Sequence, residues 1–300
     1  MRRALVASAL GLSAVAASRG VALCKAQATG ADVGAPRPSP GTPPRLVGKT
    51  FVVTGGTSGV GEAVAMRLAR EGCAGVTIVG RSEERGARVC AQLDELGCKA
   101  LFVKADMASV ADVQAVVPAH ARAFGSLDGL VNCAGDTARG SIGDQAVEDW
   151  DRLFAVNARA PFLLTQAASN YMRETGTCGS IVNIITITSH GGQPYLCGYA
   201  ASKGACVALT RNTAHALRHD RIRVNGINIG WTNSAAEHAT QLAQGAGEDW
   251  LERAAARVPF GRLVEPADIA ALAAYLLSPE AGVMTGAIID MDQMVIGAYD

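Results

Sequence analysis

The sequence predicts an α/β protein with a doubly wound parallel sheet, and three observations lead to this fold class. Short apolar segments alternate with segments of amphipathic helical character from Leu46 onward. Glycines, 34 of the 300 residues, stand at many of the junctions between them. No proline-rich or highly charged segment interrupts the alternation after residue 46, so we expect one three-layer α/β/α domain over residues 46–300.

The predicted elements follow one another in a regular order along the chain. The strands are short apolar runs at 50–54, 76–79, 100–103, the segment that opens at Leu130, and 287–291. The helices are the stretches with apolar residues at helical spacing, at 60–71, 83–96, 110–124 and 199–217. Strands that are apolar throughout are typical of a parallel sheet with helices on both faces.

The first 45 residues differ in composition from the rest of the chain. They hold six basic residues and one acid, an apolar Ala/Ser-rich stretch over 4–18, and five prolines between 36 and 44. The apolar stretch is shorter than the roughly 20 residues that a membrane span needs. The segment therefore resembles a targeting peptide followed by a stiff proline-rich linker. A plastid or mitochondrial transit peptide, a secretory signal and a disordered extension of a cytoplasmic protein all stay open.

Charge and cysteine content argue against several classes of partner. Lys and Arg number 27, as do Asp and Glu, but 21 basic and 26 acidic residues remain after residue 45. An acidic domain binds nucleic acid or an anionic membrane surface poorly, so we expect neither as a partner. The eight cysteines include no C-x-x-C pair and no His at zinc-ligand spacing. We therefore expect no metal and no disulfide framework, but buried thiols in an organelle interior or the cytosol.

A glycine-rich turn, Thr54-Gly-Gly-Thr-Ser-Gly-Val-Gly61, lies between the first predicted strand and the first helix. Glycine removes the side chain where a turn is tight and where a pyrophosphate must approach the backbone. The N–H groups at the start of the following helix favour a phosphate. This strand–turn–helix context indicates the dinucleotide site of a Rossmann fold, rather than a turn without a ligand. The residues expected to contact the cofactor here are Thr54, Gly55, Thr57, Ser58, Gly59, Val60 and Gly61.

The end of the second predicted strand, Val79-Gly80-Arg81, bears on the choice of cofactor. An NAD site usually has an acid at this point to hold the ribose hydroxyls, whereas a nearby Arg suits the 2′-phosphate of NADP. The strand ends without an acid, and Arg81 follows directly. We therefore expect NADP(H) in preference to NAD(H); the alternative for Arg81 is a solvated surface residue.

Tyr199 and Lys203 lie four residues apart at the start of a predicted helix, a spacing that puts them on one face. A free phenol has a pKa near 10, and lowering it to about 7.5 takes some 3.4 kcal/mol. An ammonium about 5 Å away, at an effective dielectric constant near 20, supplies roughly 3.3 kcal/mol. Tyr199 is therefore predicted to donate and accept a proton, with its pKa lowered by Lys203. A Tyr and a Lys four residues apart also occur by chance, so the surrounding motifs decide whether the pair is catalytic.

The context is a resemblance to the short-chain dehydrogenase/reductase family. The glycine-rich turn, residues 132–135 (Asn-Cys-Ala-Gly), Asn157 and the pair Tyr199 and Lys203 occur in the order and at the spacings of that family. The chain resembles its non-extended subgroup over nearly all of residues 46–300. The resemblance implies an NAD(P)(H)-dependent oxidoreductase that interconverts an alcohol and a carbonyl compound by hydride transfer, with Tyr199 as acid/base.

The same resemblance implies roles for further residues. Lys203 would also hold the nicotinamide ribose, and Asn157 would anchor a proton-relay water. Asp106 and Met107, after the third strand, would meet the adenine. The residues implied to line the cofactor floor, or to lie beside the nicotinamide where the family usually has Pro-Gly, are Asn132, Ala134, Gly135, Ile229 and Gly230.

One position departs from the family pattern. The family has a Ser thirteen residues before the Tyr, where it polarises the substrate oxygen, and this position is Thr186 here. Thr keeps the hydroxyl but adds a methyl group and a stiffer χ1. We expect Thr186 to take the Ser role, with Thr188 and Ser189 as alternatives.

The expected substrate is a small polar alcohol or its carbonyl counterpart, similar to a sugar or polyol. Substrate choice should come from loops at the carboxyl edge of the sheet, where many side chains can form hydrogen bonds. The candidates are Asp136, Arg139, His190, Gln193, Tyr195 and Trp231, with a lid over 234–257 that includes Trp250.

Two alternative functions stay open beside this one. One is an organellar 3-oxoacyl-[acyl-carrier-protein] reductase, although no basic cluster for an acidic carrier protein is visible near the active-site segments. The other is a non-catalytic dinucleotide-sensing protein on the same fold. The family resemblance also implies a homo-oligomer, a dimer or tetramer. Members of the family usually pair through the two long helices that follow the fourth and fifth strands of the family's sheet.

Overall fold

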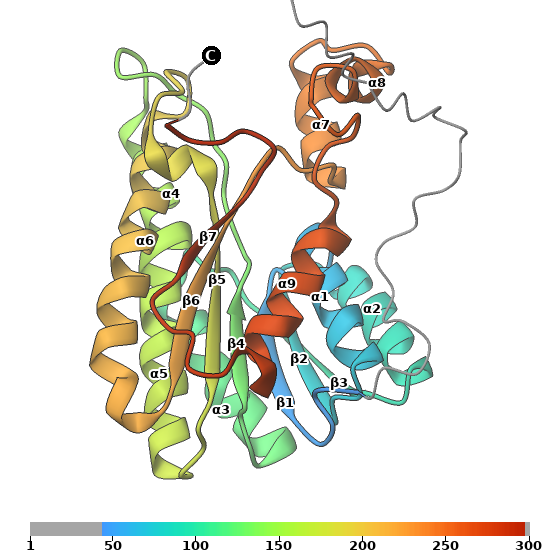
Figure 1. Cartoon of the computed structure of the whole chain (residues 1–300), viewed down its shortest axis with the longest axis vertical. Coiled ribbons are helices and arrows are strands. Elements are labelled where there is room, and N and C mark those ends of the chain that lie inside the picture. Colours follow the sequence, from blue (N-terminus) through green and yellow to red (C-terminus); the bar gives the residue numbers. More distant parts are fainter. Residues whose placement is uncertain (1–43, 298–300) are drawn as a thin grey trace, which may run out of the picture. The chain divides into compact units, whose positions relative to one another are not determined.

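The fold is built on one sheet of seven parallel strands (Figure 1). The computed structural model describes residues 44–297, so nearly all of the predicted targeting segment lies outside the described residues. The strand order is β3-β2-β1-β4-β5-β6-β7, and every neighbouring pair is parallel. The doubly wound parallel sheet predicted from the sequence is therefore confirmed.

Both faces of the sheet are buried. The strands are β1 (Thr50–Thr54), β2 (Gly75–Gly80), β3 (Lys99–Lys104), β4 (Gly129–Asn132), β5 (Ser180–Thr186), β6 (Arg223–Ile229) and β7 (Ile288–Met291). Alternate residues of β1 enter opposite cores: Val53 packs with the helices of one face and Val52 with those of the other. This two-sided burial explains why the strands are apolar throughout rather than alternating.

Helices cover the two faces in two groups, as Figure 1 shows. The helices are α1 (Gly59–Arg70), α2 (Glu83–Glu95), α3 (Val110–Phe124), α4 (Val147–Phe154), α5 (Ala160–Glu174), α6 (Cys197–Leu217), α7 (Ala235–Ala243), α8 (Trp250–Ala255) and α9 (Pro266–Leu277). The core on one face joins the sheet to α1, α2 and α9, and the core on the other joins it to α3, α5 and α6.

The strand order reverses between β1 and β4. The chain winds outward from β1 to β3 at one edge, then returns to place β4 on the other side of β1. The loops that follow β1 and β4 therefore diverge and leave a crevice at the carboxyl ends of these strands. The glycine-rich turn follows β1 and residues 132–135 end β4 and follow it, so the candidate site lies at this crevice.

Two features of the described chain were not predicted from the sequence. A π-helical turn, Ala155–Arg159, joins α4 to α5. The predicted lid contains two helices, α7 and α8, with a small core of their own formed by Trp250, Ala254 and Leu263. Figure 1 shows α7 and α8 together at the top of the view, beyond the end of the sheet.

The cysteines are only partly as expected. Cys73, Cys98 and Cys206 are buried and, like the other described cysteines, are free thiols. The Sγ atoms of Cys73 and Cys98 are 3.2 Å apart, at the turns that lead into β2 and β3. Cys178 is exposed because it lies in the turn between α5 and β5, so the expectation of buried thiols is wrong for this residue.

Two kinds of feature are absent from residues 44–297. No helix in this range is both long and apolar enough to cross a bilayer. In the same range no group of three or more His, Cys, Asp or Glu side chains could hold a metal ion.

Candidate active site

The glycine-rich turn after β1 forms a cradle that has no room for side chains. Gly55 has φ +66°, and a Cβ atom there would lie 3.0 Å from the Cα of Ala134. A Cβ atom at Gly61 would lie 2.3 Å from the carbonyl oxygen of Gly55. Ser58, the N-cap of α1, makes no side-chain hydrogen bond to the first turn of this helix within the described chain. This helix end can therefore receive an anion such as a pyrophosphate, and the cradle fits a dinucleotide.

The other residues of the turn reach neighbours on both sides of the crevice. Thr57 packs against the end of β2, where a Cβ atom at Gly80 would lie 2.7 Å from the Thr57 Cγ2. A Cβ atom at Gly59 would lie 3.9 Å from the Cβ of Ser234, the N-cap of α7. Val60 packs against the core beneath α1. The turn therefore lies between β2 and the start of the lid.

Polar side chains tie the floor of the crevice together. The hydroxyl of Thr54 accepts hydrogen bonds from the backbone N–H of Cys133 and of Ala134, both at 3.0 Å. The Asn132 Nδ2 donates to the Asn183 Oδ1 at 2.8 Å. These bonds join the carboxyl ends of β1, β4 and β5, which gives the cofactor floor a fixed geometry.

The predicted ribose and adenine contacts lie at the other end of the crevice. Arg81 is exposed after β2, and its guanidinium has no hydrogen-bond or ion-pair partner among the described residues. The Asp106 Oδ1 accepts from the N–H of Ala108 at 2.9 Å, and its Oδ2 is 3.8 Å from the guanidinium of Arg152. Met107 is buried beside it. An unpaired cation and a half-exposed carboxylate are thus available to a ribose phosphate and an adenine amine.

Lys203 lies deep in the site, with 5% of its surface exposed. Its Nζ donates to the backbone carbonyl oxygen of Ile184 at 2.9 Å. Burial lowers the pKa of Lys203. A Cβ atom at Gly135 would lie 3.6 Å from both this Nζ and the Asn157 Oδ1, so the glycine keeps the space beside both polar groups open.

Tyr199, in the first turn of α6, does not have the lowered pKa that the sequence predicted. Burial raises the pKa of Tyr199 to about 12. A hydrogen bond with the side chain of Thr186 opposes this shift, and the negative charge of Glu237 adds to it. The expectation that Lys203 makes this phenol acidic is therefore wrong for this structure, because desolvation dominates and the ammonium bonds to a backbone carbonyl.

Thr186, at the end of β5, is the hydroxyl that lies next to the phenol of Tyr199. The Thr186 Oγ1 accepts hydrogen bonds from the N–H and the hydroxyl of Thr188, at 3.3 and 3.2 Å. Because Thr188 donates to it, the Thr186 hydroxyl is left to donate its own proton to the phenol. Ser189 is turned toward β6, where its hydroxyl bonds to the Asn228 Oδ1 at 3.4 Å.

Asn157 is buried in the π-helical turn, and its amide group is fully engaged with the protein. The Oδ1 accepts from the N–H of Asp136, and the Nδ2 donates to the carbonyl oxygen of Asp136, both at 2.9 Å. The Asp136 carboxylate, a candidate for substrate contact, pairs with Arg152 at 2.9 Å. A relay water could not accept a hydrogen bond from the Asn157 side chain, because both side-chain N–H groups already donate. The water would have to donate to an oxygen atom instead.

The sequence reasoning missed Ser202, which connects Asn157 to the helix of Tyr199. The second N–H of the Asn157 amide donates to the Ser202 Oγ at 3.0 Å. This hydroxyl donates in turn to the backbone carbonyl oxygen of Tyr199 at 2.8 Å. A polar residue next to Lys203, on the buried face of the predicted helix, was the signal available in the sequence.

The segment beside the expected nicotinamide position is held without the usual proline. The Gly230 N–H donates to the carbonyl oxygen of Met291 at 2.9 Å, and a Cβ atom at Gly230 would lie 2.2 Å from the Asp292 Oδ1. The Thr232 hydroxyl donates to the carbonyl oxygen of Gly230 at 2.9 Å. Ile229 packs against the core beneath α1 and α9.

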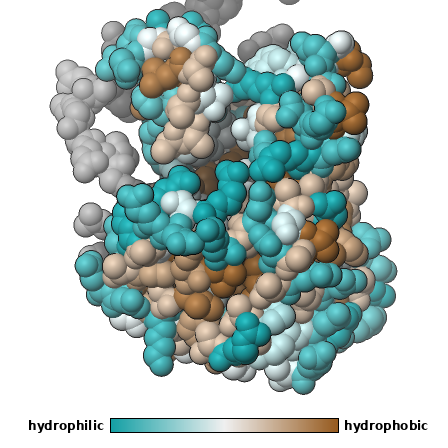
Figure 2. All heavy atoms as spheres, turned by 180° about the vertical axis from the view of Figure 1, so that it is seen from behind, coloured by the Kyte–Doolittle hydropathy of each residue, from teal (hydrophilic) through white to brown (hydrophobic). Residues whose placement is uncertain are grey.

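The loops predicted to choose the substrate meet at this end of the molecule. Figure 2 shows the surface hollowed between the lobe that holds α7 and α8 and the rest of this end. The guanidinium carbon of Arg139 lies 5.4 Å from the centre of the Tyr195 ring. The His190 Nε2 lies 3.2 Å from both carboxylate oxygens of Asp290, and Gln193 is exposed.

The two tryptophans named from the sequence have different surroundings. The Trp231 Nε1 donates to the Glu237 Oε1 at 2.8 Å, at the entrance to the lid. Trp250 is buried in the core of the lid, where its Nε1 donates to the His238 Nδ1 at 2.8 Å. Trp250 therefore supports the lid, and Glu237 is a further polar residue of the site that the sequence reasoning did not name.

The fold and the site together define a dinucleotide-dependent oxidoreductase of the Rossmann type. Residues 55–293 match a family model described as enoyl-(acyl carrier protein) reductase. An uncharacterized oxidoreductase from Thermotoga maritima is 36% identical over 245 residues, which cover 82% of this chain and 96% of that protein. The 2-(S)-hydroxypropyl-CoM dehydrogenase 3 of Xanthobacter autotrophicus is 35% identical over 248 residues, 83% of this chain and 96% of that protein.

Solved structures of oxidoreductases are also similar to this chain. An actinorhodin polyketide ketoreductase with NADPH superimposes with a TM-score of 0.78 at 31% identity, over 84% of this chain and 98% of that one. A xylitol dehydrogenase with bound NAD⁺ gives 0.76 at 28% identity, over 83% and 100%. The chain belongs to the short-chain dehydrogenase/reductase family of NAD(P)-dependent oxidoreductases, as its motifs implied.

Proposed function

We propose that this protein interconverts a small polar alcohol and its carbonyl counterpart, with Tyr199 as the acid/base. The observation that supports the proposal is the position of Thr186, at the carboxyl end of β5, beside Tyr199, whose pKa the Thr186 side chain lowers against the effect of burial. In the reductive direction, bound NAD(P)H supplies a hydride to the carbonyl carbon. Tyr199 gives its proton to the carbonyl oxygen, while Thr186 donates a hydrogen bond to the same oxygen.

The raised pKa of the phenol suits this direction of the reaction. With a pKa of about 12, Tyr199 is protonated at neutral pH, so the proton to be donated is in place before the substrate arrives. Lys203 is proposed to hold a hydroxyl of the nicotinamide ribose, next to the space that Gly135 leaves open. Asn157 holds the first turn of α6 through Ser202, which positions the phenol.

The proposed preference for NADP(H) is supported by Arg81. Its guanidinium is exposed at the end of β2 and lacks a partner within residues 44–297. A ribose 2′-phosphate would supply the missing anion. The residues proposed to contact the cofactor are those that line the glycine-rich cradle and the floor of the crevice.

An acyl-carrier-protein reductase is the second candidate. The description of the matching family model favours it. Against it, segments 132–140 and 186–199 hold one Arg and one His as their basic residues, which is too few to attract an acidic carrier protein.

An absorbance assay with NADPH and a panel of carbonyl compounds tests these candidates. We expect turnover of neutral hydroxyketones or sugars, and its loss in Tyr199→Phe. Turnover confined to 3-oxoacyl thioesters would favour the acyl-carrier alternative. Tight binding of NADPH with no turnover of any compound would favour a dinucleotide-sensing protein.

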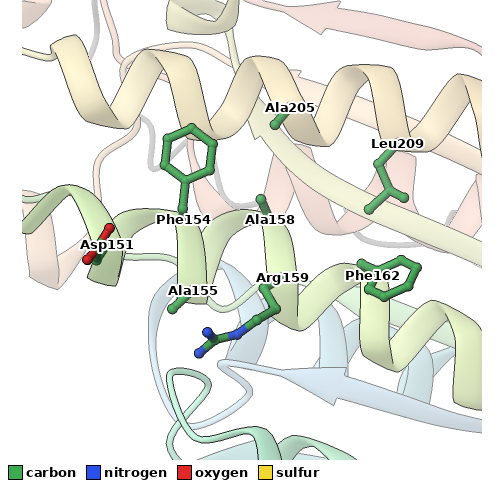
Figure 3. Close-up of a pocket in the computed structure, with 8 residues that line it drawn as sticks. All are labelled: Asp151, Phe154, Ala155, Ala158, Arg159, Phe162, Ala205 and Leu209. Carbon is green, nitrogen blue, oxygen red and sulfur yellow. The ribbon is translucent and has the colours of Figure 1, made fainter.

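We also propose a homo-oligomer that pairs through α5 and α6. A groove of about 730 Å³ lies between the π-helical turn, the start of α5 and the facing side of α6. Figure 3 shows the side chains that line it. Its lining includes Phe154, Ala158, Phe162, Ala205 and Leu209, and Phe162 is 46% exposed. A second copy of the chain, related by a two-fold axis, would bury the same apolar face on both partners. Light scattering should give a dimer or tetramer, and Phe162→Glu should weaken it; a wild-type monomer contradicts the proposal.

The role of the first 45 residues is a separate proposal. Their basic, Ala/Ser-rich composition supports targeting to a plastid or mitochondrion, with residues 46–300 as the catalytic domain. Fusion of residues 1–45 to a fluorescent protein should direct the fusion to one of these organelles. A diffuse cytoplasmic signal would contradict it.

A further inference from the structure

The sequence around Glu237 predicts that its carboxylate caps the start of α7, but in the structure the carboxylate bonds to other side chains. Ser234 is the N-cap of α7, and Ser-x-x-Glu at a helix start predicts a reciprocal capping box. The Ser234 Oγ does accept from the N–H of Glu237, at 3.2 Å. The Glu237 carboxylate does not complete the box in the described chain, however, and is directed elsewhere.

The carboxylate is held by two donors that act on the same oxygen. The Trp231 Nε1 donates to the Glu237 Oε1 at 2.8 Å, and the Gln241 Nε2 donates to it at 2.7 Å. The Oε2 has no hydrogen-bond partner among residues 44–297. No Lys, Arg or His of that range forms an ion pair with Glu237, although the side chain is partly buried.

A structural clamp does not require this chemistry. An amide oxygen would accept from Trp231 and Gln241 as well as a carboxylate oxygen does. The negative charge and the second oxygen of Glu237 are therefore surplus to the lid and are available to a ligand.

The position of Glu237 indicates what that ligand is. Trp231 directly follows Gly230, in the segment beside the expected nicotinamide, and Ser234 lies next to Gly59 of the cofactor cradle. The charge of Glu237 also raises the pKa of the Tyr199 phenol. A substrate held between Tyr199 and the lid would meet this carboxylate.

We propose that Glu237 is a specificity-determining residue whose free oxygen accepts a hydrogen bond from a hydroxyl group near the reacting carbon of the substrate. This inference rests on the proposed function and narrows it to a substrate class. The carboxylate favours neutral carbonyl compounds that carry such a hydroxyl, because a charged acceptor makes a strong hydrogen bond. It also rejects oxoacid anions, because two negative charges would share a partly desolvated site.

The experiment compares kcat/KM for three small ketones in the full-length protein with NADPH. Dihydroxyacetone carries the hydroxyl, butanone lacks it, and acetoacetate carries a negative charge. We expect the order dihydroxyacetone, butanone, acetoacetate. In Glu237→Gln, which keeps one acceptor oxygen for the clamp, the ratio of dihydroxyacetone to acetoacetate should fall at least about tenfold.

Two further variants separate charge from structure. Glu248→Gln removes the same charge from the same lid, at a side chain that is 84% exposed, and should leave the ratio unchanged. Glu237→Asp keeps the charge but shortens the side chain, so it should still reject acetoacetate while losing the preference for dihydroxyacetone over butanone. Thermal melting of each variant shows whether the lid is intact.

The outcomes distinguish this inference from the function on which it rests. Turnover with an unchanged ratio in Glu237→Gln overturns the role of Glu237 alone. An equal change in Glu248→Gln also overturns it, because general charge would then explain the effect. Absence of turnover of every carbonyl compound by the unaltered protein overturns the proposed function itself.

Discussion

The ammonium nitrogen of Lys203 donates a hydrogen bond to the backbone carbonyl oxygen of Ile184 at 2.9 Å. This bond ties α6 to β5. The neighbour that lowers the pKa of the Tyr199 phenol is Thr186, not Lys203. Burial has the largest effect on the pKa of the Tyr199 phenol and raises it to about 12. The two proposed catalytic residues are therefore a protonated phenol and a buried lysine that bonds to a backbone carbonyl, rather than an ionised base and its activator.

The first prediction concerns Lys203. In Lys203→Met the apolar stem stays but the ammonium is lost, so the buried carbonyl of Ile184 loses its donor. An unpaired buried acceptor costs about 1–3 kcal/mol, and urea unfolding should show a loss of this size. The kcat/KM for NADPH should also fall at least about tenfold, since the proposed hydrogen bond from a charged group to the ribose is removed. Lys203→Arg, which keeps the charge, should recover part of both; unaltered kinetics in Lys203→Met contradict the assignment.

The second prediction concerns the phenol itself. Tyr199→Phe keeps the ring and removes only the hydroxyl, so turnover should fall by about 10²–10⁴-fold while NADPH binding, followed by fluorescence, stays nearly intact. Because burial raises the pKa of Tyr199 to about 12, the ultraviolet difference between wild type and variant should show no phenolate up to a pH near 10.5. Phenolate absorbance below that pH, or ordinary turnover in the variant, would rule out this role.

The third prediction separates the hydroxyl of Thr186 from its shape. Thr186→Val keeps the branched side chain but cannot donate to the phenol or to a substrate oxygen, so kcat should fall at least about tenfold. Thr186→Ser restores the hydroxyl and should restore most of the rate. Thr188→Ala removes the neighbouring hydroxyl but leaves the N–H that donates to Thr186, so its effect on kcat should be smaller than that of Thr186→Val. Near-normal turnover in Thr186→Val would show that another hydroxyl serves.

The regular parts of the fold could be predicted because each depends on local pattern. The strands are buried on both faces, so they are apolar throughout, and the ends of α3 coincide with the limits of its apolar periodicity. The order of the motifs also placed Tyr199 and Thr186 in one site, since both follow from the path of β5 and α6.

Features that depend on three-dimensional surroundings could not be predicted. The pKa of Tyr199 is set by how much water the neighbouring loops exclude, which no spacing in the sequence gives. The partners of Asn157 depend on a π-helical turn, whose sequence fits an ordinary helix. The pattern at Ser234 indicates a capping box, but the Glu237 carboxylate finds better donors in Trp231 and Gln241.

The fourth prediction tests the cofactor preference at Arg81. Its unpaired guanidinium would make a charge-assisted contact with a 2′-phosphate and has no such contact to make with NADH. In Arg81→Ala the kcat/KM for NADPH should fall at least about tenfold, with that for NADH little changed. Arg85→Ala removes an exposed cation one turn further along α2 and should leave the ratio unaltered. A wild-type protein that prefers NADH would contradict the assignment of Arg81 to the 2′-phosphate.

The fifth prediction concerns stability at acid pH and the buried His120, on α3. The His120 Nε2 donates to the carbonyl oxygen of Ser126 at 2.8 Å, and its Nδ1 accepts from the Thr77 hydroxyl at 2.7 Å, an arrangement that requires the neutral ring. Burial lowers the pKa of His120 to about 4, below its usual value of 6.5. The unfolded chain therefore takes up this proton at a higher pH than the folded chain does.

The contribution of His120 to the free energy of unfolding should consequently be constant above pH 6.5. It should fall as the pH decreases from 6.5 toward 4. The loss reaches about 3 kcal/mol by linkage for a group of this pKa difference. Urea unfolding between pH 4.5 and 7.5 measures it. His120→Gln removes the titrating group but keeps a donor and an acceptor, so its curve should lack this component of the acid dependence. Wild-type and variant curves that run parallel over this range would show that His120 does not govern acid stability.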